Sequence, residues 1–143
     1  MSVEQNKAVR RRFFEEVVNQ GNLALVDELL SPDFVDHSGM FGAPGREGAR
    51  QGWAAFHAAF ASFHSTLEDL IAEGDKVVQR FTARGTHTGE WMGIPATGKQ
   101  VEVTGMAIHR IAGGKIAENW ANMDMLGFMQ QLGLVPAPGQ AGR

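Results

Sequence analysis

The chain has 143 residues, of which 43% are hydrophobic and 20% are charged, and its net charge at pH 7 is −3. This size and composition are typical of one globular domain with a core of its own. The basic residues are scattered apart from Arg10–Arg12, which argues against a nucleic-acid or anionic-membrane partner, and the absence of cysteine excludes disulfides, thiolate metal sites and cysteine nucleophiles.

The N-terminal part of the chain has the pattern of two helices. Ser2 and Gln5 have the spacing of a capping box, and apolar residues then recur at helical intervals. Gly21 is expected to end this first helix. Asn22 is expected to cap a second helix over residues 23–30, which the following Ser-Pro pair ends.

An extended stretch over residues 33–38 and a Gly- and Pro-rich loop over residues 39–48 come next. A third helix follows this loop. We expect it to carry four aromatic side chains on one stripe: Trp53, Phe56, Phe60 and Phe63.

From Ser65 onward the apolar residues alternate with a period of two, which is typical of strands. The expected strands cover residues 66–72, 76–88, 101–111 and 115–123. A loop over 89–99 separates the middle strands, and a short helix over 124–132 closes the domain. The domain is therefore expected to span residues 1–135, with a flexible tail over residues 136–143.

The last two strands are expected to form a hairpin about Gly113-Gly114, a pair that two-residue turns favour. Closing the hairpin there places His109 opposite Glu118 and Ala107 opposite Trp120. Because strand side chains alternate between faces, His109 then shares its face with a polar and aromatic set. That set is Ile116, Glu118, Trp120, Asn122 and Asp124. A core needs no such polar set, so this face predicts the wall of a pocket.

Helices followed by antiparallel strands predict an α+β domain, with the helices packed on one face of a curved, antiparallel or mixed sheet. A sheet that bends round the helices encloses a cone-shaped pocket between them and its concave face.

Four segments of the chain resemble the SnoaL-like polyketide cyclases, also called ester cyclases. They are residues 85–99, the hairpin residues 114–120 with Glu118 and Trp120, residues 124–133, and the pair Asp36-His37. The resemblance as a whole covers nearly the entire chain, from the first helix to Gly133.

This resemblance implies the α+β cone of the nuclear-transport-factor-two-like proteins, which agrees with the architecture expected from the patterns. It also implies a cofactor-free intramolecular aldol cyclisation of a polyketide ester. Asp124 matches the family's acid/base aspartate, and His109 matches a histidine associated with that site. The family positions of His37 and His87 make them further pocket candidates.

Asp124 has a second interpretation, because an aspartate directly before a helix is a preferred N-cap. Capping keeps the carboxylate ionised, whereas a base that abstracts a proton next to a carbonyl needs a raised pKa. The residues alone favour the cap, and the family match favours the base.

The other candidates also have structural interpretations. Glu118 opposite His109 would either fix the imidazole tautomer or form an ordinary cross-strand charge pair. His37 and His87, taken alone, fit hydrogen-bonded structural histidines. Trp120 is the preferred substrate-shaping residue because it shares the polar face, and for Trp91 and Trp53 core packing is the default beside a role in substrate binding.

We therefore expect a small enzyme in which Asp124 removes a proton from an apolar carbon acid and His109 assists at the developing oxyanion. No cofactor or metal is expected, since no nucleotide-binding or His-Glu-x-x-His motif occurs. The alternatives are a non-catalytic protein that binds a small apolar ligand, and an isomerase, dehydratase or hydrolase of the same superfamily. The absence of tyrosine weighs against a ketosteroid-isomerase type of oxyanion hole.

Two further expectations concern the setting of the protein. It lacks a long apolar run or a signal-peptide pattern, so a cytoplasmic location without membrane contact is expected. A homodimer is expected through the outer face of the hairpin strands. The residues assigned to that face are Thr104, Met106, Ile108, Ala117, Ala121 and Met123.

Overall fold

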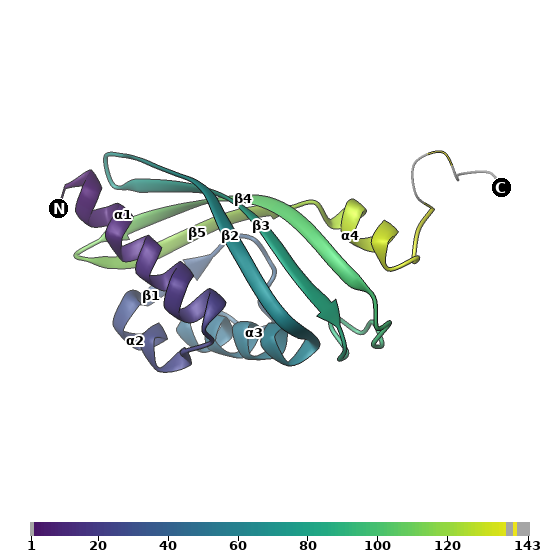
Figure 1. The fold of residues 1–143 in the computed structure, drawn as a ribbon. Coiled ribbons are helices and arrows are strands. Elements are labelled where there is room, and N and C mark those ends of the chain that lie inside the picture. Colours follow the sequence, from purple (N-terminus) through teal and green to yellow (C-terminus); the bar gives the residue numbers. More distant parts are fainter. Residues whose placement is uncertain (1, 137–138, 140–143) are drawn as a thin grey trace.

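The computed structural model describes residues 2–136 and 139, and one five-stranded mixed sheet in the order β1-β5-β4-β3-β2 carries the helices (Figure 1). The helical elements are α1 (Val3–Arg12), η1 (Phe13–Asn19), η2 (Leu23–Leu25), α2 (Val26–Leu29), α3 (Gly45–Ala59) and α4 (Met125–Gln131). The strands are β1 (Leu30–Asp36), β2 (Phe60–Glu73), β3 (Lys76–His87), β4 (Gln100–Ala112) and β5 (Lys115–Met123). The predicted α+β class is confirmed. The predicted tail, 136–143, lies almost wholly outside the described residues.

In Figure 1, α1 crosses the long strands, α2 and α3 lie together below it, and α4 lies beyond the other end of the sheet. Strand β1 runs parallel to β5, and the other neighbouring strands are antiparallel. Within the part of the chain that the structure describes, no helix is long and apolar enough to cross a membrane.

The first helix begins with the expected capping box. The Ser2 hydroxyl accepts from the Gln5 backbone N–H at 3.1 Å, and the Gln5 side chain accepts from the Ser2 backbone N–H at 2.8 Å. The helix continues through the π-helical segment η1 and ends before Gly21, whose φ of +72° suits glycine. The expected second helix is wrong in part, because Asn22 makes no side-chain cap and Leu30 already pairs with Ile116 of β5.

The expected aromatic stripe is also divided between two elements. Trp53 and Phe56 lie on α3, but this helix ends at Ala59, and Phe60 and Phe63 belong to β2. Pairing of Phe60 with His87 of β3 shows that the strand begins before the predicted start at Thr66. Aromatic residues favour strands when they pack against a sheet neighbour, and this packing overrides the helical spacing.

The hairpin forms where expected, but its register is different beyond the turn. Ile111 lies opposite Ile116 as predicted, and one extra residue in β5 then forms a β-bulge. Beyond the bulge Glu118 pairs with Arg110, not with His109 as predicted. The predicted pairing of Ala107 with Trp120 is wrong for the same reason, because Trp120 lies opposite Ile108. A shift of one residue moves every later side chain of β5 to the other face.

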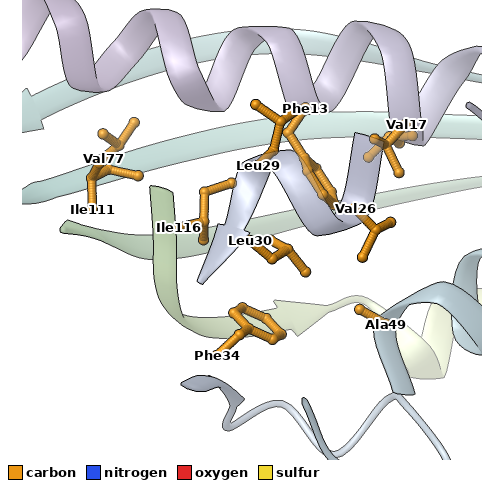
Figure 2. Packing of buried hydrophobic residues seen from close by; sticks show 11 residues of the cluster. Phe13, Val17, Val26, Leu29, Leu30, Phe34, Ala49, Val77, Ile111 and Ile116 are labelled. Carbon is orange, nitrogen blue, oxygen red and sulfur yellow. The ribbon is translucent and has the colours of Figure 1, made fainter. Parts of the chain in front are cut away.

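Two groups of buried side chains hold the helices against the sheet. The first lies between the helical elements η1, α2 and α3 and the strands β1, β3, β4 and β5 (Figure 2). Its largest fully buried members include Val17, Val77 and Ile116. The second surrounds Phe60, Trp91 and Phe128 at the end of the sheet nearer α4. Residues of both groups line the cavity described below.

The two faces of the sheet differ in how much an isoleucine stabilises the fold. Ile116 is 1% exposed in the first core group, whereas Ile108 is 39% exposed on the opposite face. We expect Ile116→Ala to lower the free energy of unfolding by about 2–5 kcal/mol, because it leaves a void among packed side chains. Ile108→Ala should cost less than about 1.5 kcal/mol. Urea unfolding of both variants checks this, and equal losses would contradict the assignment of the two faces.

Candidate active site

The helices and the concave face of the sheet enclose a cavity of about 120 Å³. All nine phenylalanines of the chain and two of its three tryptophans line this cavity. The aromatic rings also contact one another, as in the edge-on pairs of Trp91 with Phe56 and with Phe128, whose centroids are 5.2 Å apart in each case. The lining therefore offers a large apolar surface and few directional contacts to a bound molecule.

His109 projects into this apolar cavity from β4, between Val77 of β3 and Asn119 of β5. Its side chain is 3% exposed, and neither ring nitrogen has a hydrogen-bond partner within the described residues. Burial, and secondly the positive charge of Arg10, hold the pKa of His109 well below its usual value. The imidazole is therefore neutral at physiological pH and offers one N–H donor and one nitrogen acceptor.

Arg10 reaches the same cavity from α1. Its Nε donates a hydrogen bond to Gln79 Oε1 at 2.8 Å, and its guanidinium carbon lies 4.8 Å from the centre of the Phe13 ring. Burial lowers the pKa of Arg10 to about 9, so the group remains a cation at neutral pH. No carboxylate of the described residues lies within 4 Å of this guanidinium.

Asn119 supplies a hydrogen-bond acceptor next to His109. Its Nδ2 donates to Asp36 Oδ1 at 2.5 Å, and the hydroxyl of Ser38 donates to the same carboxylate. This contact fixes the amide, since a carboxylate accepts only from its NH₂ group. Asn119 Oδ1 is buried and lacks a partner among the described residues.

Asp124 lies outside the lining of the cavity, on an exposed position directly before α4. Its Oδ1 accepts from the Gly127 backbone N–H at 2.9 Å, which is the N-cap that the residues alone favour. The capped helix carries Phe128, whose ring does line the cavity. The catalytic role expected of Asp124 stays a prediction. In the structure its side chain caps the N-terminus of α4.

Three other predicted site residues lie together on the convex face of the sheet. Glu118 accepts from Arg110 Nε at 2.6 Å and contacts His37 Nε2 at 2.8 Å, and the His37 ring stacks on Trp120 at 4.9 Å. The hydrogen bonds from His37 and then from Arg110 lower the pKa of Glu118. None of the three lines the cavity with His109, and for Glu118 and Trp120 the reason is the bulge in β5.

The remaining candidates divide into lining and supporting residues. Trp53 and Trp91 line the cavity. His87 is fully buried behind it, where its Nδ1 lies 3.0 Å from Thr97 Oγ1 and its ring stacks on Phe60. His87 therefore fixes the loop that follows β3 against the aromatic wall.

Arg10, Gln79 and Asn119 are polar lining residues that the sequence analysis missed. Arg10 had a detectable signal, because it lies at helical spacing from Phe13 and Val17 and so falls on the apolar stripe of the first helix. Asn119 had none, since only the bulge turns it inward. Among the described residues, no three His, Asp or Glu side chains are grouped closely enough to hold a metal ion.

Comparisons with known proteins agree with this architecture. The sequence model of the SnoaL-like polyketide cyclases matches residues 8–132. The aklanonic acid methyl ester cyclase DauD of Streptomyces sp. (strain C5) is 30% identical over 111 residues, which are 76% of this chain and 67% of DauD. The corresponding cyclase DnrD of Streptomyces peucetius is 31% identical over 108 residues, 74% of this chain and 72% of DnrD.

Solved structures extend the likeness to almost the whole fold. TsrD from Streptomyces laurentii superposes with a TM-score of 0.86 at 30% identity, covering 94% of this chain and 99% of TsrD. IdmH from Streptomyces antibioticus superposes with a TM-score of 0.77 at 36% identity, covering 90% of this chain and 99% of IdmH.

The neutral state of His109 predicts a pH-dependent stability. As the pH falls below 7, the unfolded chain takes up a proton at the ordinary histidine pKa of about 6.5, whereas folded His109 takes one up only at a lower pH because burial lowers its pKa. The contribution of His109 to stability is therefore complete above this pH and is lost below it, by up to about 1.4 kcal/mol per pH unit.

Urea unfolding of the native protein and of His109→Gln at pH 7 and below checks the prediction. The other titrating groups are common to both proteins, so their effects cancel in the difference between the two free energies of unfolding. As the pH falls, the free energy of unfolding of the native protein should decrease relative to that of His109→Gln. A constant difference would contradict a buried neutral imidazole.

Proposed function

Because the chain belongs to the SnoaL-like polyketide cyclase family, we propose that it cyclises an apolar, polyketide-like molecule inside this cavity without a cofactor. The observation that carries the proposal is His109, a neutral and unpartnered imidazole in a cavity that is otherwise mostly apolar. Family membership supports an enzyme of the cyclase type, and the lining supports a small apolar substrate.

The proposed reaction is an intramolecular aldol step with His109 as acid/base residue. Its unprotonated ring nitrogen takes a proton from a carbon next to a carbonyl group, and the resulting enolate carbon attacks a second carbonyl of the same molecule. A carbon–carbon bond forms, and the imidazolium returns the proton to the new alkoxide. Atoms and charge balance within the substrate and His109, so the product is an isomer of the substrate.

Burial suits His109 to this cycle because the imidazolium is disfavoured and readily gives its proton back. The same low pKa makes it a weak base, so the substrate carbon must be acidified by carbonyl groups on either side. The aromatic walls exclude water and hold the flexible chain in a folded shape, which brings its reacting carbons together.

One observation favours a second candidate function, the binding of a small apolar ligand without catalysis. Among the described residues, the cavity lining contains no carboxylate, and its ionisable residues are Arg10, Arg84 and His109. Arg84 pairs with Glu102 at an exposed position, which leaves His109 as the one candidate base of the lining. Loss of this base separates the two functions, since a binding protein keeps its affinity without it.

Turnover of aklanonic acid methyl ester, after which the relatives DauD and DnrD are named, tests the proposed function. We expect the native protein to convert it to a product of equal mass in buffer without added cofactor, measured by chromatography and mass spectrometry. His109→Gln should lower the rate by about 10²- to 10⁴-fold, the usual contribution of a general acid/base.

Two substitutions of Asp124 form the matched control. Asparagine caps a helix as well as aspartate does, so Asp124→Asn removes the carboxylate but keeps the cap, whereas Asp124→Ala also costs about 1 kcal/mol of stability. We expect Asp124→Asn to retain the native rate. If it loses turnover while His109→Gln retains it, the base is Asp124 and the assignment to His109 is wrong.

We also infer a homodimer through the convex face of the sheet. The face differs from the sequence-based one, because Ala121 and Met123 line the cavity and Ala117 is buried. An apolar row nevertheless crosses four strands there, through direct pairing of Ile71, Val78, Ile108 and Trp120. Ile71 is 62% exposed and Ile108 is 39% exposed, and a second copy would cover both.

Sedimentation velocity at micromolar concentration checks the dimer. Ile108→Glu should shift the protein to the monomer mass, because it places a charge in the middle of the apolar row. Leu126→Glu, at an exposed apolar residue of α4, is the matched control and should leave the dimer intact. A native protein that sediments as a monomer would contradict the inference.

A further inference from the structure

We propose that Arg10 makes part of the cavity a binding site for an anionic oxygen, so that the ligand is an apolar molecule with a carboxylate or enolate group. The inference rests on the proposed function, because it concerns the same cavity. It adds the chemical class of the molecule that the cavity selects.

The environment of Arg10 differs from that of the other arginines. Six arginines pair with carboxylates, namely Arg12, Arg46, Arg50, Arg80, Arg84 and Arg110, and Arg11 is exposed. Arg10 is 5% exposed, and the described residues place no carboxylate beside it. Arg10 is thus a buried cation that lacks an anionic partner among the described residues.

The neutral contacts of Arg10 leave most of its donors unused. A guanidinium carries five N–H groups in a fixed plane, and the recorded side-chain hydrogen bond is the one from Nε to Gln79. This bond and the Phe13 ring fix the guanidinium within the cavity wall. A planar, fixed group of this kind matches the two oxygens of a carboxylate, or the two oxygens of an enolised 1,3-dicarbonyl.

The polar groups nearby complement an anion and not a second cation. His109 is neutral and can donate its N–H to the same ligand, while protonation of its ring would place two positive charges together. Asn119 Oδ1 can accept from a hydroxyl or enol of the ligand. These unpartnered groups line the same cavity as the aromatic rings that would hold an apolar body.

The proposed role of Arg10 explains how a base as weak as His109 is sufficient to remove a proton from the substrate carbon. Proton transfer from the substrate to His109 creates an enolate and an imidazolium, and the enolate oxygen is stabilised by the cation already present. The net charge of the cavity and its ligand together is unchanged by this transfer. Arg10 thereby lowers the energy of the charged intermediate without taking part in the proton transfer itself.

Isothermal titration of two isosteric probes tests the site. 2-Naphthoate and 2-naphthamide have the same aromatic body and differ in the charge of one group. We expect the native protein to bind 2-naphthoate at least about 10-fold more tightly, as charge-assisted hydrogen bonds in a dry cavity favour the anion. Arg10→Met should abolish this preference and leave the binding of 2-naphthamide within about threefold of the native value, as expected when only a charge is removed.

Arg11→Met is the matched control, because it removes the neighbouring exposed arginine, and it should keep the native preference. Arg10→Lys should retain part of the preference, since it keeps a positive charge but loses the planar set of donors.

Equal binding of the two probes by the native protein would overturn the anion site and leave the apolar cavity of the proposed function intact. An unchanged preference in Arg10→Met would overturn it in the same way. Binding of neither probe would count against both the anion site and the cavity as a binding site.

Discussion

The β-bulge in β5 determines which side chains of the central hairpin reach the cavity. Ile116 and Ala117 are consecutive and both buried, so the strand has one residue more than its partner at this point. From there on, Asn119, Ala121 and Met123 face the helices, while Glu118 and Trp120 face the opposite side. The placement of Asn119 beside His109, and of the ionic contacts of Glu118 away from it, both depend on this single inserted residue.

The same arrangement separates two electrostatic environments by the thickness of one sheet. On the convex face, Glu118 is balanced by Arg110 and His37 in contact with solvent. On the concave face, Arg10 and His109 are buried together without a carboxylate beside Arg10 among the described residues. A carboxylate at position 118 pointing inward would neutralise Arg10 and raise the basicity of His109. The bulge therefore keeps the Glu118 carboxylate out of the cavity that holds Arg10 and His109.

The sequence predicted the parts of the fold that depend on local patterns. The Ser2 capping box, the Gly113-Gly114 turn and the limits of β5 follow from short-range chemistry. The secondary structure of Phe60 and Phe63 could not be predicted from local patterns. Their spacing fits a helix, and only the pairing of β2 with β3 makes this segment a strand.

The candidate site also depends on contacts between distant segments, which local sequence patterns do not determine. His109 was correctly assigned to the strand that lines the pocket, but its partners depend on a register that a single residue changes. Asp124 was correctly expected at the start of the last helix, where the cap was one of its two interpretations. The helical spacing of Arg10 from Phe13 and Val17 could have placed it on the apolar stripe of the first helix, but the lack of a carboxylate beside it among the described residues has no signature along a chain.

The phenylalanine lining has a consequence for how the substrate selectivity of this cavity can evolve. Phenylalanine rings recognise volume and shape, whereas the polar groups of the lining are few and come from α1, the loop after β1 and strands β2 to β5. A substitution of one ring by a smaller apolar residue would alter which molecules fit, and would leave Arg10, His109 and Asn119 where they are. Selectivity for the shape of the substrate and reactivity thus reside in different residues, so a substrate of another shape can be acquired without rebuilding the chemistry that acts on it.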